Sequence, residues 1–293
     1  MKLAICSYSL SGIVNKDGIT EKDLLRIAKE MGFEAFEFSE INTPEGMSKI
    51  EYAGELREEA EKVGIPIVQY SIGADFIYGS DGNLQKEIER LKSEVDVAEA
   101  LGVSGMRHDT AYGYKDEDAE KYTFRDALPR LIEGCKKVTE YAKTKGIKTM
   151  TENHGYFSQD SDRVKAIVEG VADENFGTLV DIGNFLCVDE NPVDAVKVTS
   201  PYAFYVHAKD FHTKKADEIL SDDGFFKTRN GNYLRGAVLG HGDVPVSEAL
   251  EIIKNNGYDG FVTLEFEGVE DTRKGCEWGL NTLKKVQEKL NWY

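Results

Sequence analysis

The sequence has little positive charge. It contains 36 Lys and Arg residues against 53 Asp and Glu residues, so its formal net charge is −17. Such a surface repels nucleic-acid phosphates and anionic lipid head groups. We therefore expect neither a nucleic acid nor a membrane as a partner.

Long apolar runs and paired cysteines are also missing. No stretch approaches the roughly 20 apolar residues of a membrane span, and the first residues, MKLAICSYSL, turn polar too soon for a signal peptide. The cysteines Cys6, Cys135, Cys187 and Cys276 show no CxxC spacing. These features predict a cytoplasmic protein with reduced, mostly buried thiols, and they disfavour a zinc–thiolate site.

Glycine-rich phosphate loops are absent as well, which disfavours a doubly wound nucleotide-binding sheet. The sequence instead alternates short apolar runs with longer amphipathic segments. The eight short runs, which we predict to be strands, are Leu3–Cys6, Ala35–Phe38, Pro66–Tyr70, Gly105–Arg107, Lys148–Thr151, Gly177–Val180, Ala203–Val206 and Gly260–Leu264.

The amphipathic segments predict eight helices. Several of them end in a glycine that leads directly into the next strand, which is a common way to stop a helix. Strands that alternate with helices pair in parallel through crossovers. We therefore expect one domain over residues 1–293, an α/β protein folded as a (β/α)8 TIM barrel. The first predicted helix opens at Thr20 and runs to Met31. The other seven are Ser48–Val63, Leu84–Leu101, Phe124–Lys145, Ser161–Gly170, Val193–Val198, Val246–Asn256 and Asp271–Leu290.

One connection is unusually long. Residues 211–243 show no clear helix or barrel strand, although Asn230-Gly231 between two short runs indicates a hairpin. Long connections in compact domains are usually functional. We expect this one to cover the pocket and set specificity; the alternative is a peripheral surface excursion.

Acidic and imidazole side chains follow four consecutive predicted strands. They are Glu152, Asp181, His207 and Glu265. The carboxyl ends of barrel strands face one shared mouth. Three carboxylates and one imidazole suit a single divalent ion, with Mn²⁺ as the first expectation and Mg²⁺, Co²⁺ or Zn²⁺ as alternatives. Another interpretation stays open, in which the acidic residues cap helices and His207 is an ordinary core histidine.

The segments around these residues resemble a known family. Thr151-Glu-Asn-His-Gly, Val180-Asp-Ile-Gly-Asn, His207-Ala-Lys-Asp and the closing Phe261-Val-Thr-Leu-Glu are similar to motifs of the xylose isomerase-like TIM barrels, the sugar phosphate isomerases/epimerases. The resemblance covers nearly the whole chain. It implies that the four residues are metal ligands. It also implies that Glu152 and Glu265 are the catalytic acid–base pair, as in the ketose epimerases.

The resemblance is weaker at the level of substrate. Ketose 3-epimerases have a histidine where this chain has Asn184, and an arginine where it has Thr213. The Lys209-Asp210 pair is instead similar to the inosose-type members. The resemblance thus implies an isomerase or epimerase that moves protons on a keto-sugar or related polyol through an enediolate. A lyase of the same family, inosose dehydratase-like or 3-oxo-glycoside-cleaving, is the alternative, because elimination begins from the same enolate.

An endonuclease IV-like phosphodiesterase is a distant alternative, because its three-metal site needs more than the five histidines present. The predicted partner is a small sugar or sugar-like molecule, and a homo-oligomer is left open. The residues proposed to contact the substrate lie at or near strand ends: Arg107, His108, His154, Asn184, Lys209 and Asp210.

Overall fold

Eight parallel strands close into a barrel, in the order β1-β11-β7-β6-β5-β4-β3-β2. The computed structural model describes residues 1–219 and 221–293. The barrel strands are β1 Lys2–Cys6, β2 Ala35–Ser39, β3 Ile67–Ile72, β4 Gly105–His108, β5 Lys148–Glu152, β6 Phe176–Asp181, β7 Ala203–Ala208 and β11 Phe261–Leu264. The predicted TIM barrel is therefore confirmed.

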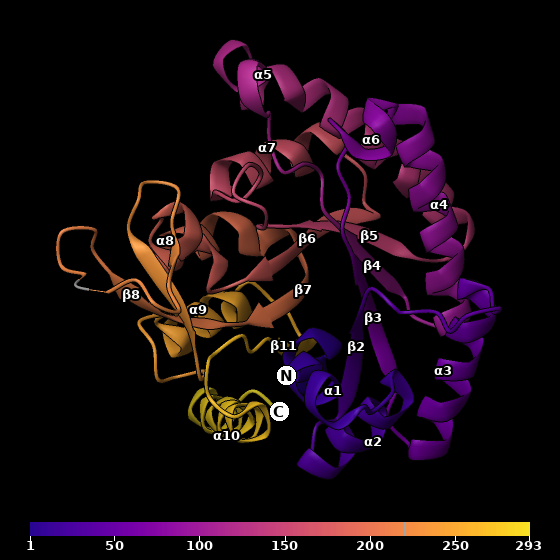
Figure 1. The fold of residues 1–293 in the computed structure, drawn as a ribbon, viewed down its shortest axis with the longest axis vertical. Coiled ribbons are helices and arrows are strands. Elements are labelled where there is room, and N and C mark those ends of the chain that lie inside the picture. The colour runs from indigo at the N-terminus through magenta and orange to yellow at the C-terminus, as the bar shows by residue number, and fades with distance from the viewer. Residues whose placement is uncertain (220) are drawn as a thin grey trace.

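Helices surround this ring (Figure 1). All eight predicted helices are present. Two further helices, α1 and α5, were not predicted because each is too short to show a helical hydrophobic period. The bounds are α1 Ser11–Asp17, α2 Glu21–Met31, α3 Lys49–Val63, α4 Leu84–Leu101, α5 Asp116–Lys121, α6 Phe124–Thr144, α7 Ser161–Val171, α8 Pro192–Thr199, α9 Val246–Asn255 and α10 Thr272–Leu290.

Local sequence signals set the ends of α2. The Thr20 side chain accepts a hydrogen bond from the Asp23 amide, and the Asp23 carboxylate accepts one from the Thr20 amide at 2.9 Å. This reciprocal capping satisfies amide groups that have no partner inside the helix. At the other end, Gly32 has φ of +94°, a conformation that favours glycine and stops the helix before β2.

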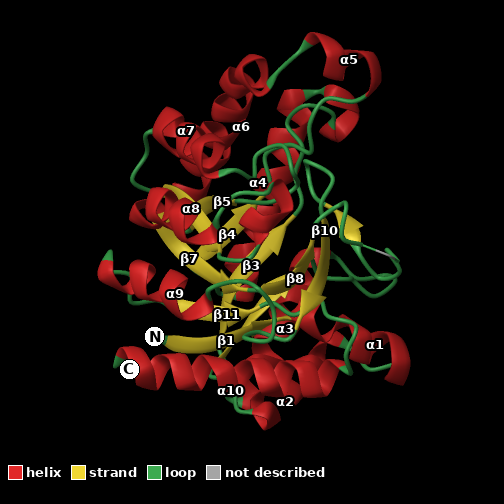
Figure 2. Cartoon of the chain, turned by 90° about the vertical axis from the view of Figure 1, so that its left-hand side faces the viewer, coloured by secondary structure: helices red, strands yellow, loops and turns green. Residues whose placement is uncertain are grey.

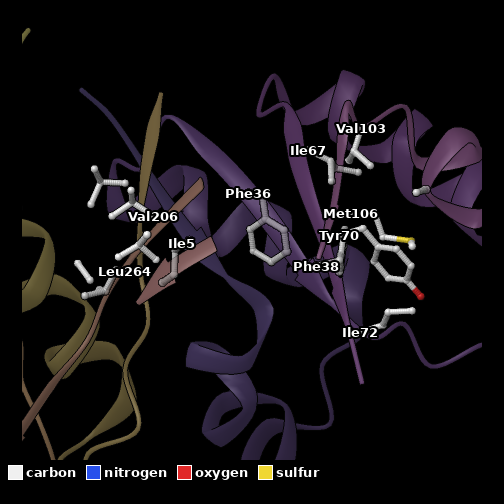
Figure 3. Packing of buried hydrophobic residues seen from close by; sticks show 14 of the residues in the cluster. Ile5, Phe36, Phe38, Ile67, Tyr70, Ile72, Val103, Met106, Val206 and Leu264 are labelled. Carbon is white, nitrogen blue, oxygen red and sulfur yellow. The ribbon is translucent and has the colours of Figure 1, made fainter. Parts of the chain in front are cut away.

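Side chains along each strand alternate between the barrel interior and the helix layer. Phe36, Phe38, Tyr70 and Met106 are fully buried in the apolar cluster that joins strands to helices (Figure 3). Each such side chain contributes about 1.5–3 kcal/mol by burial. Between the two phenylalanines, Glu37 points the other way, into the barrel, where it contacts His207.

A smaller apolar cluster fills the barrel beneath the predicted metal residues. It consists of Met150, Leu179 and Tyr205. These residues lie on β5, β6 and β7, and each stands two positions before one of the predicted metal ligands. Because side chains two positions apart on a strand face the same way, each apolar residue and its metal ligand point into the barrel together. The cluster therefore closes the barrel interior and leaves the polar side chains at its carboxyl end.

The long connection after β7 forms a sheet of its own. Strands β8 Asp210–Lys214, β10 Tyr233–Ala237 and β9 Phe226–Lys227 pair antiparallel in that order. The predicted hairpin at Asn230-Gly231 joins β9 to β10, and Gly231 has φ of +90°. Figures 1 and 2 show this sheet beside the barrel, not within its ring.

The two chain ends meet on the outside of the barrel. The Met1 ammonium group donates a hydrogen bond to the Trp292 carbonyl oxygen at 2.6 Å. The four cysteines are buried and form no disulfide within the described residues. Across residues 1–219 and 221–293, no helix combines the length and apolar character needed to cross a bilayer.

Candidate functional site

The four predicted metal residues converge at one point. Glu152 ends β5, Asp181 ends β6, His207 lies on β7 and Glu265 directly follows β11. One ligand atom from each residue can be chosen so that all lie within 4.8 Å of one another. The first three are buried and Glu265 is nearly so. The structure therefore contains a cluster of side chains that could hold a metal ion, as the strand-end pattern predicted.

Buried polar atoms without partners show that this cluster fits a cation. Asp181 Oδ1 accepts hydrogen bonds from the amides of Gly183 and Asn184, but its Oδ2 has no partner among the described residues. The Nε2 atom of His207 lies 2.8 Å from Glu37 Oε2. Its other ring nitrogen, Nδ1, has no hydrogen-bond partner among the described residues. A buried polar atom without a partner is costly, and a bound cation would satisfy both atoms.

Repulsion among the carboxylates points the same way. Burial raises the pKa of Asp181 to about 7, and the neighbouring Glu265 and Glu152 charges add to this effect, while Lys209 opposes it. Burial also acts to raise the pKa of Glu265, but Lys209 and His207 outweigh it and hold that pKa well below its ordinary value. A divalent cation would stabilise all of the carboxylates in their charged form.

Arg107 and His154 reach this site, as predicted. The Nε of Arg107 donates to Glu152 Oε2 at 2.6 Å, and its guanidinium also lies 3.4 Å from Asp109 Oδ1. His154 Nδ1 lies 3.1 Å from the same Asp109 oxygen. These contacts orient Glu152 and leave the Nε2 side of the imidazole available to a molecule in the pocket.

Asn184 and Lys209 also reach the site. Asn184 Nδ2 donates to Glu152 Oε1 at 3.1 Å, and Asn184 Oδ1 accepts from Lys209 Nζ at 3.1 Å. Lys209 Nζ lies 2.6 Å from Glu265 Oε2. Burial lowers the pKa of Lys209, but the surrounding carboxylates, Glu265 first, outweigh it and raise that pKa well above its ordinary value. This ammonium group therefore stays charged beside Glu265, with Asp181 Oδ2 at 3.6 Å and Glu267 Oε2 at 3.7 Å.

The structure does not bring the other two predicted substrate residues, His108 and Asp210, into the pocket. His108 follows Arg107 on β4, so its side chain faces the opposite way and packs between the rings of Phe76 and Phe176. Asp210 follows Lys209 in the same manner. Its carboxylate accepts hydrogen bonds from four backbone amides, those of Phe211, Gly240, Gly242 and Val244. Strand alternation separates each of these residues from its inward-facing neighbour.

Glu37 is the main site residue that the sequence analysis missed. Besides its contact with His207, it accepts a hydrogen bond from Ser71 Oγ at 2.6 Å, and it is fully buried. When a histidine binds a metal through one ring nitrogen, a carboxylate that accepts a hydrogen bond from the other ring N–H fixes the orientation of the imidazole. A usable signal was present, because a charged residue between two phenylalanines of a strand must face away from the apolar layer.

Glu152, His207 and Glu265 line a cavity of about 330 Å³, together with Arg107 and Lys209. A second cavity of about 400 Å³ adjoins it, and the two share Tyr8, His154, Lys209 and Glu267. Both volumes fall within the usual range of small-molecule sites, about 300–1,000 Å³. We call the 330 Å³ cavity the inner cavity. Glu152, Glu265, His207 and Lys209 line it, so proton donors and acceptors surround any molecule bound there.

The fold and this site define a single-domain barrel with a carboxylate-rich group of side chains at its mouth that could hold a metal ion. The family described as xylose isomerase-like TIM barrel matches residues 25–286, and the chain belongs to this family. The resemblance read from the motifs is thus confirmed.

Relatives of known activity fall into more than one class. The inosose dehydratase of Clostridium perfringens (strain 13 / Type A) is 27% identical over 165 residues, 55% of this chain and 54% of that protein. The chain therefore matches about half the length of its curated relatives. L-ribulose 3-epimerase superposes with a TM-score of 0.75 at 16% identity, over 99% of this chain and 96% of that one. A xylose isomerase-like TIM barrel protein from Mycobacterium smegmatis in complex with magnesium gives 0.70 at 19% identity, over 92% and 89%. These structural matches support the fold alone.

Removal of one ligand tests the metal cluster. We expect His207→Ala to weaken binding of Mn²⁺ or Mg²⁺ at least about 100-fold, because changes to residues that only support a ligand already cost about 10–100-fold. Glu37→Gln should fall in that lesser range. Titration calorimetry on protein stripped of metal measures both effects, with the exposed His241 changed to Ala as the control. Equal affinity in wild type and His207→Ala would remove His207 from the site.

Proposed function

We propose that the protein is a metal-dependent isomerase or epimerase that moves a proton next to the carbonyl group of a keto-sugar or related polyol. The arrangement of Glu152 and Glu265 supports this most strongly. Glu152 ends β5 and Glu265 follows β11; β6 and β7 separate these strands around the ring, and yet both side chains reach the same centre. Two carboxylates that approach one molecule from different sides can remove a proton from one face and return it to the other.

Other residues of the site prepare these two glutamates for proton transfer. A bound divalent ion, held by Glu152, Asp181, His207 and Glu265, would supply the Lewis acidity that stabilises negative charge on substrate oxygens. Arg107 and Asn184 hold the two oxygens of Glu152 in place. Lys209 lies against Glu265 and can donate to a developing oxyanion. His154 is placed to contact a substrate hydroxyl through Nε2.

Elimination is the second candidate. It uses the same proton abstraction, after which a hydroxyl group, protonated to water, or the aglycone leaves instead of a proton returning. The 27% sequence identity with an inosose dehydratase supports this alternative. The contact between Lys209 and Asn184, which both line the 400 Å³ cavity, supports it as well. Lys209 is a charged donor that could protonate a leaving oxygen.

Solvent exchange tests the proposal and separates the two candidates. We expect substrate incubated with enzyme and Mn²⁺ in D₂O to acquire deuterium at the carbon next to its carbonyl. A panel of free ketoses, sugar phosphates, inososes and 3-oxo-glycosides covers the relevant chemistry, and mass spectrometry reads the products. Deuterium in a product of unchanged formula indicates isomerisation or epimerisation, and loss of water or an aglycone indicates elimination. Absence of exchange with every member, in Mn²⁺, Mg²⁺ and Co²⁺, would contradict proton transfer.

A further inference from the structure

A second cavity of about 400 Å³ adjoins the inner cavity. We call it the outer chamber. The long connection after β7, residues 211–243, which we call the excursion, builds one wall of this chamber. The wall consists of Phe211 on β8, Phe226 on β9 and Arg235 on β10. Because the outer chamber shares four lining residues with the inner cavity, a molecule bound at the two glutamates can extend directly into it.

Apolar side chains form part of the walls of the outer chamber. Phe211 and Phe226 meet edge to face with ring centroids 5.7 Å apart, and Tyr156 and Val269 lie exposed at its rim. Cys187 also lines it. Burial raises the pKa of this thiol to about 12, so the sulfur is neutral and behaves as an apolar surface. Such a lining favours a flat apolar group.

The polar side chains found only in the outer chamber are already engaged, with one exception. The Tyr156 hydroxyl donates to the Lys227 carbonyl oxygen, and Gln159 bonds the Tyr156 amide and the Asn184 carbonyl oxygen. Asn184 bonds Glu152 and Lys209. Arg235 is the exception, because its buried Nε has no acceptor among residues 1–219 and 221–293. Its guanidinium instead lies over the Phe225 ring, 5.1 Å from the ring centroid.

We propose that the outer chamber is a second subsite for an aryl group that carries a hydrogen-bond acceptor, so that the substrate is a two-part compound: a sugar linked to an aromatic ring. This inference rests on the proposed function only in placing the sugar at the inner cavity. Beyond the four residues shared with the inner cavity, a second sugar fits the chamber less well, because its hydroxyl groups would meet Phe211, Phe226 and Val269 and one donor without an acceptor in the described part of the chain, Arg235 Nε. An aromatic ring with a carboxylate or phenolate oxygen supplies the acceptor that Arg235 Nε lacks among the described residues.

Binding of glycosides that cannot react tests the subsite without depending on turnover. The probes are methyl, phenyl and 4-carboxyphenyl glycosides of several pyranoses, together with matching disaccharides, titrated into the Mn²⁺-loaded protein. We expect the 4-carboxyphenyl compound to bind at least about tenfold more tightly than its methyl partner, as one charge-assisted hydrogen bond and a stacked ring allow. Arg235→Gln should reduce its affinity to that of the phenyl compound, and Phe226→Ala should weaken both aryl compounds.

Arg125→Gln, at an exposed position of α6 outside both cavities, is the matched control and should leave every affinity unchanged. Equal affinity of methyl and aryl glycosides, the absence of binding by all of them, or tighter binding of the disaccharides would overturn the proposal. The exchange experiment fails separately. An aryl preference without exchange leaves the subsite standing, whereas exchange with free sugars and no aryl preference leaves only the proposed function.

Discussion

Changing Glu265 to Gln is expected to lower the rate of deuterium exchange into substrate by about 10²–10⁴-fold, the usual contribution of a positioned acid or base. Glutamine keeps the shape of the side chain and one oxygen for a metal, but it cannot accept the proton. Glu265 is also the closest carboxylate to Lys209, at 2.6 Å, so the change frees that ammonium group as well. Exchange of the substrate proton with D₂O, measured by mass spectrometry at saturating Mn²⁺, gives the rate.

Glu152→Gln should cause a loss of similar size for a separate reason. Its two oxygens are held by Arg107 and Asn184, so the amide would place an NH₂ group against one of these donors. Glu277→Gln, at an exposed position of α10, serves as the control. Metal content is measured in parallel, because a variant that has lost its ion says nothing about the base. Exchange at the wild-type rate in both metal-loaded variants would exclude the two-glutamate mechanism.

Changing Asp210 to Ala is expected to destabilise the protein by about 3 kcal/mol or more, because a buried carboxylate and the acceptor of four backbone amides are lost together. Those amides belong to Phe211, Gly240, Gly242 and Val244, which bracket the excursion after β7. For a chain of this size, such a change corresponds to a fall of roughly 6 °C or more in Tm. Thermal unfolding followed by circular dichroism measures it.

Asp243→Ala is the matched control for this loss. The Asp243 carboxylate accepts hydrogen bonds from the amide and hydroxyl group of Thr213, both at exposed positions, so water can replace it. We expect this variant to lose less than about 1 kcal/mol. Similar Tm values for the two variants would show that Asp210 does not organise the excursion, and its role as a substrate contact would then need to be reconsidered.

The metal cluster could be predicted from the sequence because it depends on regular structure. Each ligand comes at the end of a strand or directly after it, and parallel barrel strands bring their carboxyl ends to one mouth. A residue such as Asp181 therefore needs only its strand to be recognised. The same reasoning placed Arg107, His154, Asn184 and Lys209 near the mouth, where the structure has them.

The facing of adjacent residues was harder to predict. His108 and Asp210 follow Arg107 and Lys209, and in each pair only the first side chain enters the pocket. A shift of one residue in a strand reverses its faces. Unless the faces of each strand are assigned, Glu37 is missed as well, because its partner His207 lies 170 residues away.

The sequence by itself determined the barrel, its strand and helix order and the four residues of the metal cluster, because these follow from local patterns repeated along the chain. Only the tertiary structure decided what surrounds them. It pairs Glu37 with His207 and turns Asp210 toward four backbone amides. It also folds the excursion into a wall of the outer chamber, where Arg235 Nε has no acceptor among the described residues. These contacts join segments far apart in the chain, and side chains at such distances leave no periodic signal in the sequence.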